Sequence, residues 1–222
     1  MPHAVPPGRP KMAGVEGQRS YGGISADERT ARRRRQLLDA GLEIFGSTGY
    51  RAATVRQVCR VAKVADRYFY DQFRTMEDLL VAVYQECVDR LEDSIAVPIQ
   101  TAGSVAEMAR LGGLESFLAA VQDDPRLARV VWFEVLGVSP EVETTYLSRM
   151  ARFGELLITA APAPFAVVPE LRPLVADAVI GGISHVVMTW LASGFAAPRA
   201  DVVTALELFL TSVAGGTVTA PE

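Results

Sequence analysis

The sequence predicts an all-α protein, and three observations support this fold class. Three segments match the helix capping box, in which a Ser or Thr side chain and a Glu or Gln three residues later cap each other's backbone. They are Ser25–Glu28, Thr54–Gln57 and Ser104–Glu107. Apolar residues recur at helical spacing, without the alternation of strands. With 222 residues, half of them hydrophobic and 22% charged, the chain is long enough for a buried core.

The N-terminal part predicts a tail followed by four helices. Residues 1–24 are rich in Pro and Gly and are interpreted as a disordered tail. A helix over 27–45 carries apolar residues on one face, and a short helix begins at Thr54. A second short helix is expected over 66–73, with Phe69 and Phe73 inward. A long helix over 75–95 should then end at Pro98.

The remainder predicts five more helices, more apolar than the first four. They are expected over 104–123, 125–136, 140–160, 169–193 and 199–213. The stretch Ala178–Pro198 carries no Asp, Glu, Lys or Arg and approaches the length of a membrane span. Gly and Ser residues dilute its hydrophobicity, so we interpret it as a helix buried on both sides.

Composition excludes several classes of protein. The two cysteines (Cys59 and Cys87) and two histidines (His3 and His185) are too few for a disulfide scaffold or a Cys-rich or His-based metal centre. The cysteines are interpreted as packing residues. Neither a Gly-rich phosphate loop nor a nucleophile elbow is present, so we expect no enzyme, metal or cofactor. The N-terminus lacks the apolar segment of a signal peptide, which makes a cytoplasmic protein the expectation.

Charge is distributed unevenly along the chain. Residues 1–82 hold 14 Lys and Arg against 9 Asp and Glu, whereas residues 83–222 hold 8 against 17. A basic N-terminal part is typical of nucleic-acid binding. Two short helices separated by three residues and braced by a preceding helix predict a helix-turn-helix there. Its second short helix would present its outer side chains to the major groove.

These residues resemble the TetR (Tet-repressor) family of bacterial transcription regulators. The resemblance covers about 33–80 and is carried by Gln36–Phe45, Gly49-Tyr50, Ala53–Val58, Val64, Phe69–Phe73 and Glu77–Leu80. It implies a DNA-binding domain over 25–74 and a helical ligand-binding and dimerisation domain over 75–222. The implied protein is a homodimeric regulator, in particular a repressor, which binds a palindromic double-stranded DNA operator and responds to a small hydrophobic ligand.

The resemblance also implies roles for individual residues. The expected DNA-binding residues are Thr54, Arg56, Ala65, Asp66, Arg67, Tyr68, Tyr70, Asp71 and Gln72, together with Arg32 and Arg33 in the preceding helix. Several positions depart from the family pattern. Lys63 stands where a turn glycine is usual, so a non-glycine residue is expected at positive φ. Asp66 and Asp71 add negative charge to a surface meant for DNA.

Further residues are assigned roles in the C-terminal helices. Large apolar side chains that would fill a core or line a ligand cavity are Met108, Phe117, Trp132, Phe133, Tyr146, Met150 and Phe153. Glu134 and Arg149 interrupt apolar faces and are candidates for polar ligand contacts. The resemblance places the dimer interface on the last two long helices, with Gly181, Gly182, His185 and Ala192 in it.

The sequence therefore predicts a ligand-responsive, DNA-binding transcriptional regulator. The alternative is a helical small-molecule-binding protein in which DNA binding is weakened or lost, because Asp66 and Asp71 are anionic and Met76 replaces a common lysine. Binding to duplex DNA distinguishes the two.

Overall fold

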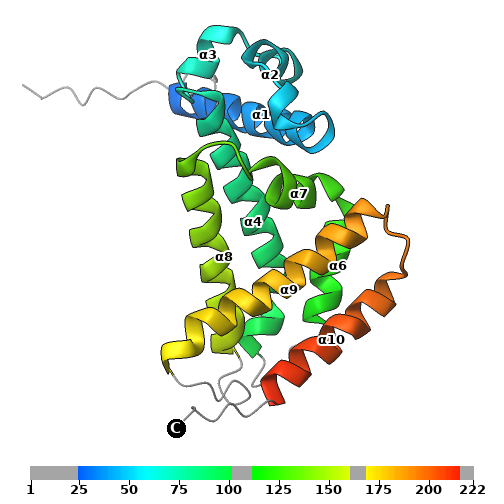
Figure 1. The fold of residues 1–222 in the computed structure, drawn as a ribbon. Helices are drawn as coiled ribbons and strands as arrows, with labels where there is room; N and C mark the ends of the chain where they lie inside the picture. The colour runs from blue at the N-terminus through cyan, green and yellow to red at the C-terminus, as the bar shows by residue number, and fades with distance from the viewer. Residues whose placement is uncertain (1–24, 102–111, 161–168, 216–222) are drawn as a thin grey trace, which may run out of the picture.

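The computed structural model describes residues 25–101, 112–160 and 169–215, and the elements within these ranges are all helical (Figure 1). The all-α fold class predicted from the sequence is confirmed. The elements in chain order are α1 (Ala26–Ser47), η1 (Tyr50–Ala52), α2 (Val55–Ala62), α3 (Asp66–Tyr70), α4 (Met76–Thr101), α6 (Gly113–Asp123), α7 (Pro125–Arg129), η2 (Val130–Glu134), α8 (Pro140–Ala160), η3 (Pro169–Leu171), α9 (Arg172–Ala192) and α10 (Arg199–Gly215). The expected tail over 1–24 lies outside the described residues.

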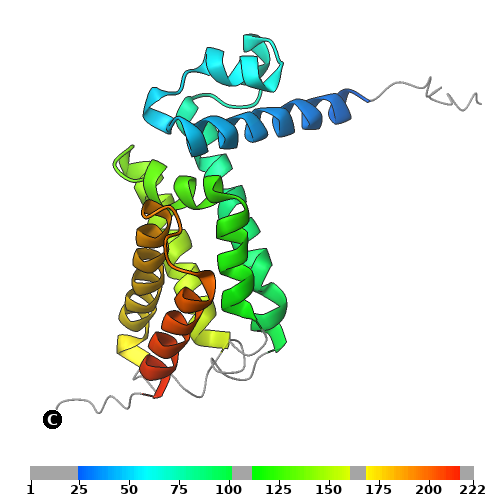
Figure 2. The same ribbon diagram turned by 90° about the vertical axis from the view of Figure 1, so that its right-hand side faces the viewer.

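The helices form two layers of different direction. Helices α1, α2 and α3 lie across one end of the molecule, and α1 runs nearly perpendicular to the bundle below it (Figure 2). Helix α4 begins beside α1 and extends down into that bundle, where it packs against α6 and α8. The long helices α8, α9 and α10 complete the bundle (Figure 1). Helix α4 thus connects the two layers.

Capping explains where the first helices begin. The Ser25 hydroxyl accepts the Glu28 backbone N–H at 3.0 Å, and the Glu28 carboxylate accepts the Ser25 N–H at 2.6 Å. Thr54 and Gln57 form the same reciprocal box at the start of α2. These two predicted capping boxes are confirmed. The third predicted box, Ser104–Glu107, lies outside the described residues.

Several predicted helix boundaries are wrong. Helix α4 continues through Pro98 to Thr101, because Ile95 is buried in the core and packing sustains the helix beyond the lost proline N–H bond. Helix α3 ends at Tyr70 instead of Phe73, although the Phe73 N–H still bonds the Phe69 carbonyl at 2.8 Å. The segment predicted as one helix over 169–193 divides into η3 and α9.

The predicted helix over 125–136 differs most from the structure. It is the short α-helix α7 followed by one π-helical turn, η2, which ends at Glu134. Asp124, at the N-cap position of α7, forms no side-chain cap hydrogen bond, because its carboxylate pairs with Arg126 and Arg90. A π-turn within a helix frequently marks a functional position, since it rotates the following side chains away from the regular helical face. Here it determines the direction of Glu134.

One hydrophobic core extends through both layers. Phe45 of α1, Phe69 of α3 and Leu79 of α4 are fully buried, and the core continues through Leu118 of α6 to Leu206 of α10. Both free cysteines belong to it. Burial raises the pKa of the Cys87 thiol to about 12, which keeps the thiol protonated at neutral pH. Their interpretation as packing residues agrees with this environment.

Candidate nucleic-acid interface and interior cavity

Helices α2 and α3 form the predicted helix-turn-helix. Val58, Cys59 and Ala62 of α2 face the core, as the helical spacing of the sequence requires. The turn passes through Lys63, which adopts the left-handed conformation with φ 56° and ψ 41°. The Val64 N–H closes the turn on the Cys59 carbonyl at 3.0 Å. The expected non-glycine residue at positive φ is therefore present.

The outer face of α3 carries most of the expected recognition residues. Phe69 is fully buried and anchors the helix, and Tyr70 packs edge-on against it with ring centroids 5.3 Å apart. The Tyr70 side chain is nevertheless 62% exposed. The other predicted residues of this region are Ala65, Asp66, Arg67 and Asp71, which are exposed, and Tyr68 and Gln72, which are half-buried.

The remaining expected DNA-binding residues flank the outer face of α3. Arg56 in the first turn of α2 and Arg32 in α1 are exposed, whereas Arg33 is half-buried. The Thr54 hydroxyl both accepts the Gln57 N–H at 3.3 Å and contacts Gln57 Oε1 at 3.0 Å. Thr54 therefore has its hydroxyl engaged in the cap before any DNA is present.

The arginines of the bundle and those around the helix-turn-helix differ in whether they form ion pairs. From Arg90 onward, every arginine within the described ranges lies within 4.0 Å of a carboxylate oxygen, at distances down to 2.5 Å. In contrast, a set of arginines around the helix-turn-helix has no such partner among the described residues; the set is Arg32, Arg33, Arg34, Arg56, Arg60 and Arg67. These positive charges remain available to an external anion.

The negative charges on α3 remain in place beside these arginines. Asp66 and Asp71 are both exposed. Asp66 lies next to Cys59, since burial, followed by the charge and hydrogen bond of Asp66, raises the pKa of that thiol. Asp71 contributes an electrostatic interaction to Arg67. Asp66 and Asp71 thus each interact with a group of the chain itself, namely the Cys59 thiol and the Arg67 guanidinium.

Glu134 links the two layers. Its side chain is 11% exposed, and one carboxylate oxygen accepts the Tyr50 backbone N–H at 2.7 Å while the other pairs with Arg129 at 3.0 Å. The preceding Gly49 has φ 96°, and a Cβ atom there would come within 3.2 Å of the same carboxylate. A second bridge joins Arg126 of α7 to Glu43 of α1 at 2.6 Å.

Both polar candidates for ligand contacts have partners elsewhere. Glu134 faces the α1–α2 connection, as described above. Arg149 of α8 pairs with Asp89 and Glu92 of α4 at 2.5 and 3.3 Å. The sequence pattern identified both as unusual but could not reveal their distant partners, because Tyr50 lies 84 positions from Glu134 and Asp89 lies 60 positions from Arg149.

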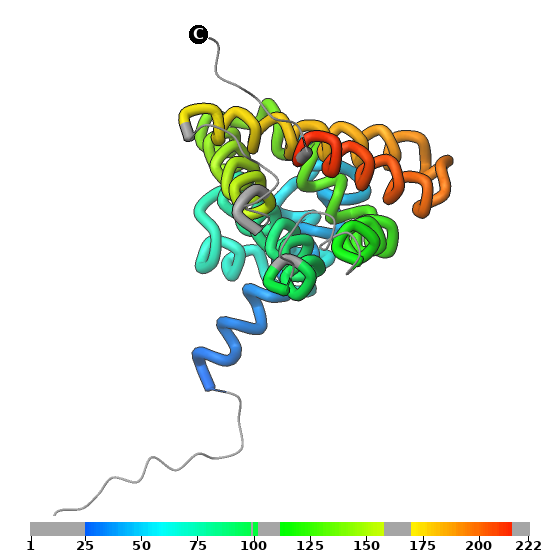
Figure 3. Tube along the Cα trace, turned by 90° about the horizontal axis from the view of Figure 1, so that it is seen from below, coloured from blue at the N-terminus to red at the C-terminus, as the bar shows by residue number. Residues whose placement is uncertain are grey.

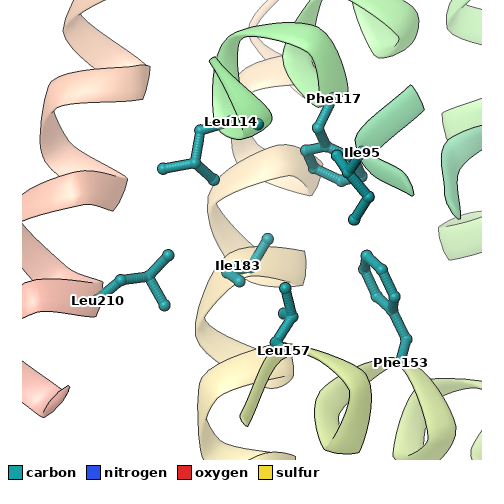
Figure 4. Close-up of a pocket in the computed structure, with 8 residues that line it drawn as sticks. Ile95, Leu114, Phe117, Phe153, Leu157, Ile183 and Leu210 are labelled. Atoms are coloured by element: carbon teal, nitrogen blue, oxygen red, sulfur yellow. The ribbon is translucent and has the colours of Figure 1, made fainter. Parts of the chain in front are cut away.

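An apolar cavity lies within the bundle. Its volume is about 20 Å³, roughly the space one water molecule needs. Side chains from five helices converge on it (Figure 4), and they are Ile95, Leu114, Phe117, Phe153, Leu157, Ile183 and Leu210, with Gly113 beside them. The described residues thus leave an interior space where one was predicted, but it is too small for a hydrophobic ligand in this conformation.

Of the six predicted cavity residues that the structure describes, two line this space, namely Phe117 and Phe153. Trp132 packs edge-on against Phe117 with centroids 6.4 Å apart, and Tyr146 packs against Tyr84. Met150 is buried in the core, and Phe133 is 42% exposed at the surface. Met108 lies outside the described residues. The sequence could not separate these environments, since all seven residues satisfy the same apolar pattern.

Helices α9 and α10 lie side by side at one edge of the bundle, opposite the projecting N-terminal half of α1 (Figure 3). Leu174 and Leu208 on these helices are 64% and 68% exposed. Gly181, His185 and Ala192 are also exposed.

Gly182 differs from these neighbours on α9. A Cβ atom at Gly182 would come within 3.0 Å of the Phe209 ring, so its small size serves packing inside the chain. At Gly181 nothing lies within 4 Å of such an atom. Helix α9 is long and apolar enough to cross a membrane by composition, but 39% of its most apolar window is buried against its own chain.

No group of three His, Cys, Asp or Glu residues suited to a metal ion occurs among the described residues.

The comparisons with known proteins agree with this architecture. The family model described as "Bacterial regulatory proteins, tetR family" matches residues 37–83, which span the helix-turn-helix and the start of α4. The fatty acid metabolism regulator protein of Bacillus subtilis is 31% identical over 64 residues, 27% of this chain and 33% of that protein. The regulator HbdR of Aromatoleum sp. is 31% identical over 99 residues, 45% of this chain and 42% of HbdR. The chain thus matches less than half the length of these two curated relatives.

Solved structures resemble the chain over a greater length. The fatty acid degradation regulator FadR from Bacillus halodurans superposes with a TM-score of 0.68 at 22% identity, covering 81% of this chain and 94% of that one. FadR from Bacillus subtilis, in complex with stearoyl-CoA, gives a TM-score of 0.68 at 18% identity, covering 81% and 98%. At this identity the likeness concerns the fold, and it extends through the bundle. Residues 37–83 thus match the TetR family of bacterial regulatory proteins, and the described fold as a whole resembles that of the solved regulators.

Proposed function

We propose that the chain is a transcriptional regulator that binds a palindromic DNA operator as a homodimer, as the sequence also predicts. The observation that carries the proposal is the group of arginines around the helix-turn-helix that form no ion pair with a carboxylate of the described residues. Among the described residues, every arginine from Arg90 onward lies within 4.0 Å of a carboxylate oxygen, so an unpaired set around the helix-turn-helix supports binding of a polyanion. The exposed face of α3 beside these arginines is of a size to enter a major groove.

In this proposal residues 25–74 bind DNA and residues 75–222 form the regulatory and dimerisation part. A second copy of the chain would cover the exposed apolar face of α9 and α10, including Leu174, Gly181 and Leu208. The high apolar content of α9, of which the chain itself covers only part, supports this pairing. A two-fold dimer would place two α3 helices in successive major grooves of one duplex.

The proposed effector is a small hydrophobic molecule that occupies an enlarged form of the bundle cavity. The lining side chains are all apolar, which favours an aliphatic or aromatic ligand. Since the cavity is about 20 Å³ here, this conformation corresponds to the ligand-free protein. Long-chain acyl-CoA is the first probe to test, because a solved relative of the same fold was captured with stearoyl-CoA.

The effector would act through the junction between the layers. Enlarging the cavity must displace α4, α6 or the helices opposite them, and α7 and η2 follow α6 directly. Glu134 and Arg126 attach this segment to α1 through Tyr50 and Glu43. Ligand and DNA would then be coupled because each favours a different position of the same junction, and the coupling must be reciprocal.

Selection from a pool of random 30-base-pair duplexes tests the proposed function, followed by fluorescence anisotropy on the enriched sequence. We expect an enriched inverted repeat and an affinity that falls steeply with salt. The purified protein should bind the enriched duplex more tightly than a scrambled duplex of the same composition. Failure to bind either duplex at low salt would contradict DNA binding.

The same experiment decides on the alternative of a ligand-binding protein without DNA binding. Asp66 and Asp71 on the outer face of α3 favour that alternative, because each opposes a phosphate. If the wild-type protein binds no duplex while stearoyl-CoA raises its melting temperature, the alternative is supported. Asp71→Asn together with Asp66→Asn should then confer measurable duplex binding on the protein.

A further inference from the structure

Tyr68 joins helix α1 to helix α3. The guanidinium carbon of Arg33, from α1, lies 3.8 Å from the centroid of the Tyr68 ring. The guanidinium carbon of Arg67, the neighbouring residue in α3, lies 4.7 Å from the same centroid. Arg67 Nη2 also donates a hydrogen bond to the Tyr68 hydroxyl at 2.8 Å. Both distances are those of cation–π contacts.

The two guanidinium groups are held together with no carboxylate at ion-pair distance, although the charge of Asp71 acts on Arg67. Neither forms an ion pair with any of the residues that the structure describes. Arg35, only two positions from Arg33, pairs with both Asp39 and Glu86. The hydrogen bond from Arg67, then the charges of Arg67 and Arg33, lower the pKa of the Tyr68 phenol, so both cations act on the same side chain. Two like charges close together favour an anion between or beside them.

We propose that Tyr68 is a positioning residue that holds Arg33 and Arg67 as a preformed clamp for a backbone phosphate of DNA. The proposal rests on the proposed DNA-binding function and adds a residue that organises it. A phosphate group offers several anionic acceptor oxygens and accommodates two guanidinium groups. A guanine edge offers two acceptors, which a single arginine fills. The sharing of one ring by two arginines therefore indicates a phosphate.

The clamp has a thermodynamic advantage and a structural consequence. Arginine side chains lose rotamer freedom when they bind, and a contact that restricts them beforehand lowers this cost. Because Arg33 belongs to α1 and Arg67 to α3, one phosphate contact would fix the orientation of both helices on the duplex. The contact would set the position of α3 in the groove without reading the base sequence.

The test compares Tyr68→Phe and Tyr68→Leu with the wild-type protein in the full-length chain. Anisotropy at fixed salt measures binding to the duplex enriched from the random pool and to a scrambled duplex. Tyr68→Leu should lower both affinities by the same factor, about five- to tenfold, since it removes two cation–π contacts and a hydrogen bond. Tyr68→Phe keeps the ring and should lower both about two- to threefold.

A double-mutant cycle and two controls make the role specific. Arg67→Ala should cost clearly less in the Tyr68→Leu background than in the wild type, because the clamp is already lost. The melting temperature of Tyr68→Phe should match the wild type, which separates positioning from folding. Arg152→Ala removes the same charge from the exposed surface of α8, where the side chain is 70% exposed, and should leave binding unchanged.

Three results would overturn the clamp while the proposed function stands. The first is a folded Tyr68→Leu protein that binds DNA as tightly as the wild type. The second is a loss of affinity for the enriched duplex alone. The third is additive effects of Tyr68→Phe and Arg67→Ala on the free energy of DNA binding. If Tyr68→Leu does not fold, the Tyr68→Phe cycle alone decides. A wild-type protein that binds neither duplex would instead contradict the proposed function, and the clamp with it.

Discussion

The carboxylate of Glu134 accepts the backbone N–H of Tyr50 across 84 positions of sequence, with the oxygen 2.7 Å from the nitrogen. The relationship depends on three local features. The π-helical turn η2 directs Glu134 toward α1, Gly49 at φ 96° exposes the Tyr50 N–H, and Arg129 holds the other carboxylate oxygen. One side chain of the bundle thus caps the connection that leads from α1 to the helix-turn-helix.

Glu134→Ala should destabilise the protein by leaving the Tyr50 N–H without a partner. An unsatisfied polar group of this kind costs about 1–3 kcal/mol. For a chain of this size that corresponds to a fall of roughly 2–10 °C in melting temperature. Glu143→Ala is the matched control, because Glu143 accepts the Gly137 N–H at an exposed site where water can replace it. Equal melting temperatures for both variants would show that Glu134 does not stabilise the junction.

DNA contacts predicted on the outer face of α3 are testable one at a time. Tyr70→Phe and Arg56→Ala should each weaken operator binding by at least about 1 kcal/mol, the scale of one good contact. Arg56→Ala should also reduce the dependence of affinity on salt, since it removes one phosphate-binding charge. Anisotropy titrations at salt concentrations from about 50 to about 200 mM measure both the affinity and its dependence on salt. Unchanged affinity in both variants would show that this face does not meet DNA.

The N-terminal helices could be predicted closely because their signals are local. Capping boxes at Ser25 and Thr54 and the inward Phe69 depend on spacings of three or four residues, which a sequence displays directly. The predicted outer residues of α3 are exposed for the same reason. Lys63 could be expected at positive φ only through the resemblance to the TetR family, in which glycine is usual at this turn position.

The bundle was less predictable because its decisive contacts join distant residues. Nothing near Gly182 in sequence indicates that it packs against Phe209, and nothing near Phe133 indicates that this ring reaches the surface. The π-turn at η2 could not be foreseen, since its apolar spacing matches an ordinary helix. Likewise, Tyr68 was expected only as an outward residue, whereas its contact with Arg33 requires the packing of α1 on α3.

Gly181 and Gly182 give a direct test of the proposed dimer. Gly181→Arg places a charge on the exposed face of α9, where nothing within the chain is displaced, and should convert the dimer to a folded monomer. Gly182→Ala would bring a methyl group against the Phe209 ring and should lower the melting temperature while the dimer persists. Sedimentation velocity at micromolar concentration distinguishes these results. A wild-type monomer, or a dimer that tolerates Gly181→Arg, would contradict the assignment.

The cysteines should resist modification in the folded protein. Burial raises the pKa of Cys87 to about 12, and burial followed by Asp66 raises that of Cys59. At pH 8 iodoacetamide should label neither thiol in native protein and both in urea, as mass spectrometry would show.

The same shifts predict a dependence of stability on pH. The unfolded chain releases these thiol protons near pH 8.5, whereas the folded chain retains that of Cys87 to about pH 12. The contribution to stability is therefore fully present below pH 8.5 and is lost as pH rises toward 12. Cys87→Ala should make the loss shallower. Rapid native labelling of Cys87 at pH 8 would contradict its burial.

The volume of the cavity in this conformation, about 20 Å³, is too small for the proposed ligand. If stearoyl-CoA is an effector, the bundle must open before or during binding, and the ligand must then stabilise the opened form. Ile183→Phe would fill the cavity from α9 and should abolish the ligand-dependent rise in melting temperature while operator binding persists. Leu147→Trp, on the exposed surface of α8, is the control and should leave both properties unchanged. In the wild type, stearoyl-CoA should lower the affinity of the protein for the operator, and the operator should lower the affinity of the protein for stearoyl-CoA by the same factor. Calorimetry measures both affinities. A ligand effect that survives Ile183→Phe would place the effector site elsewhere, and absence of any effect in the wild type would exclude stearoyl-CoA as the effector.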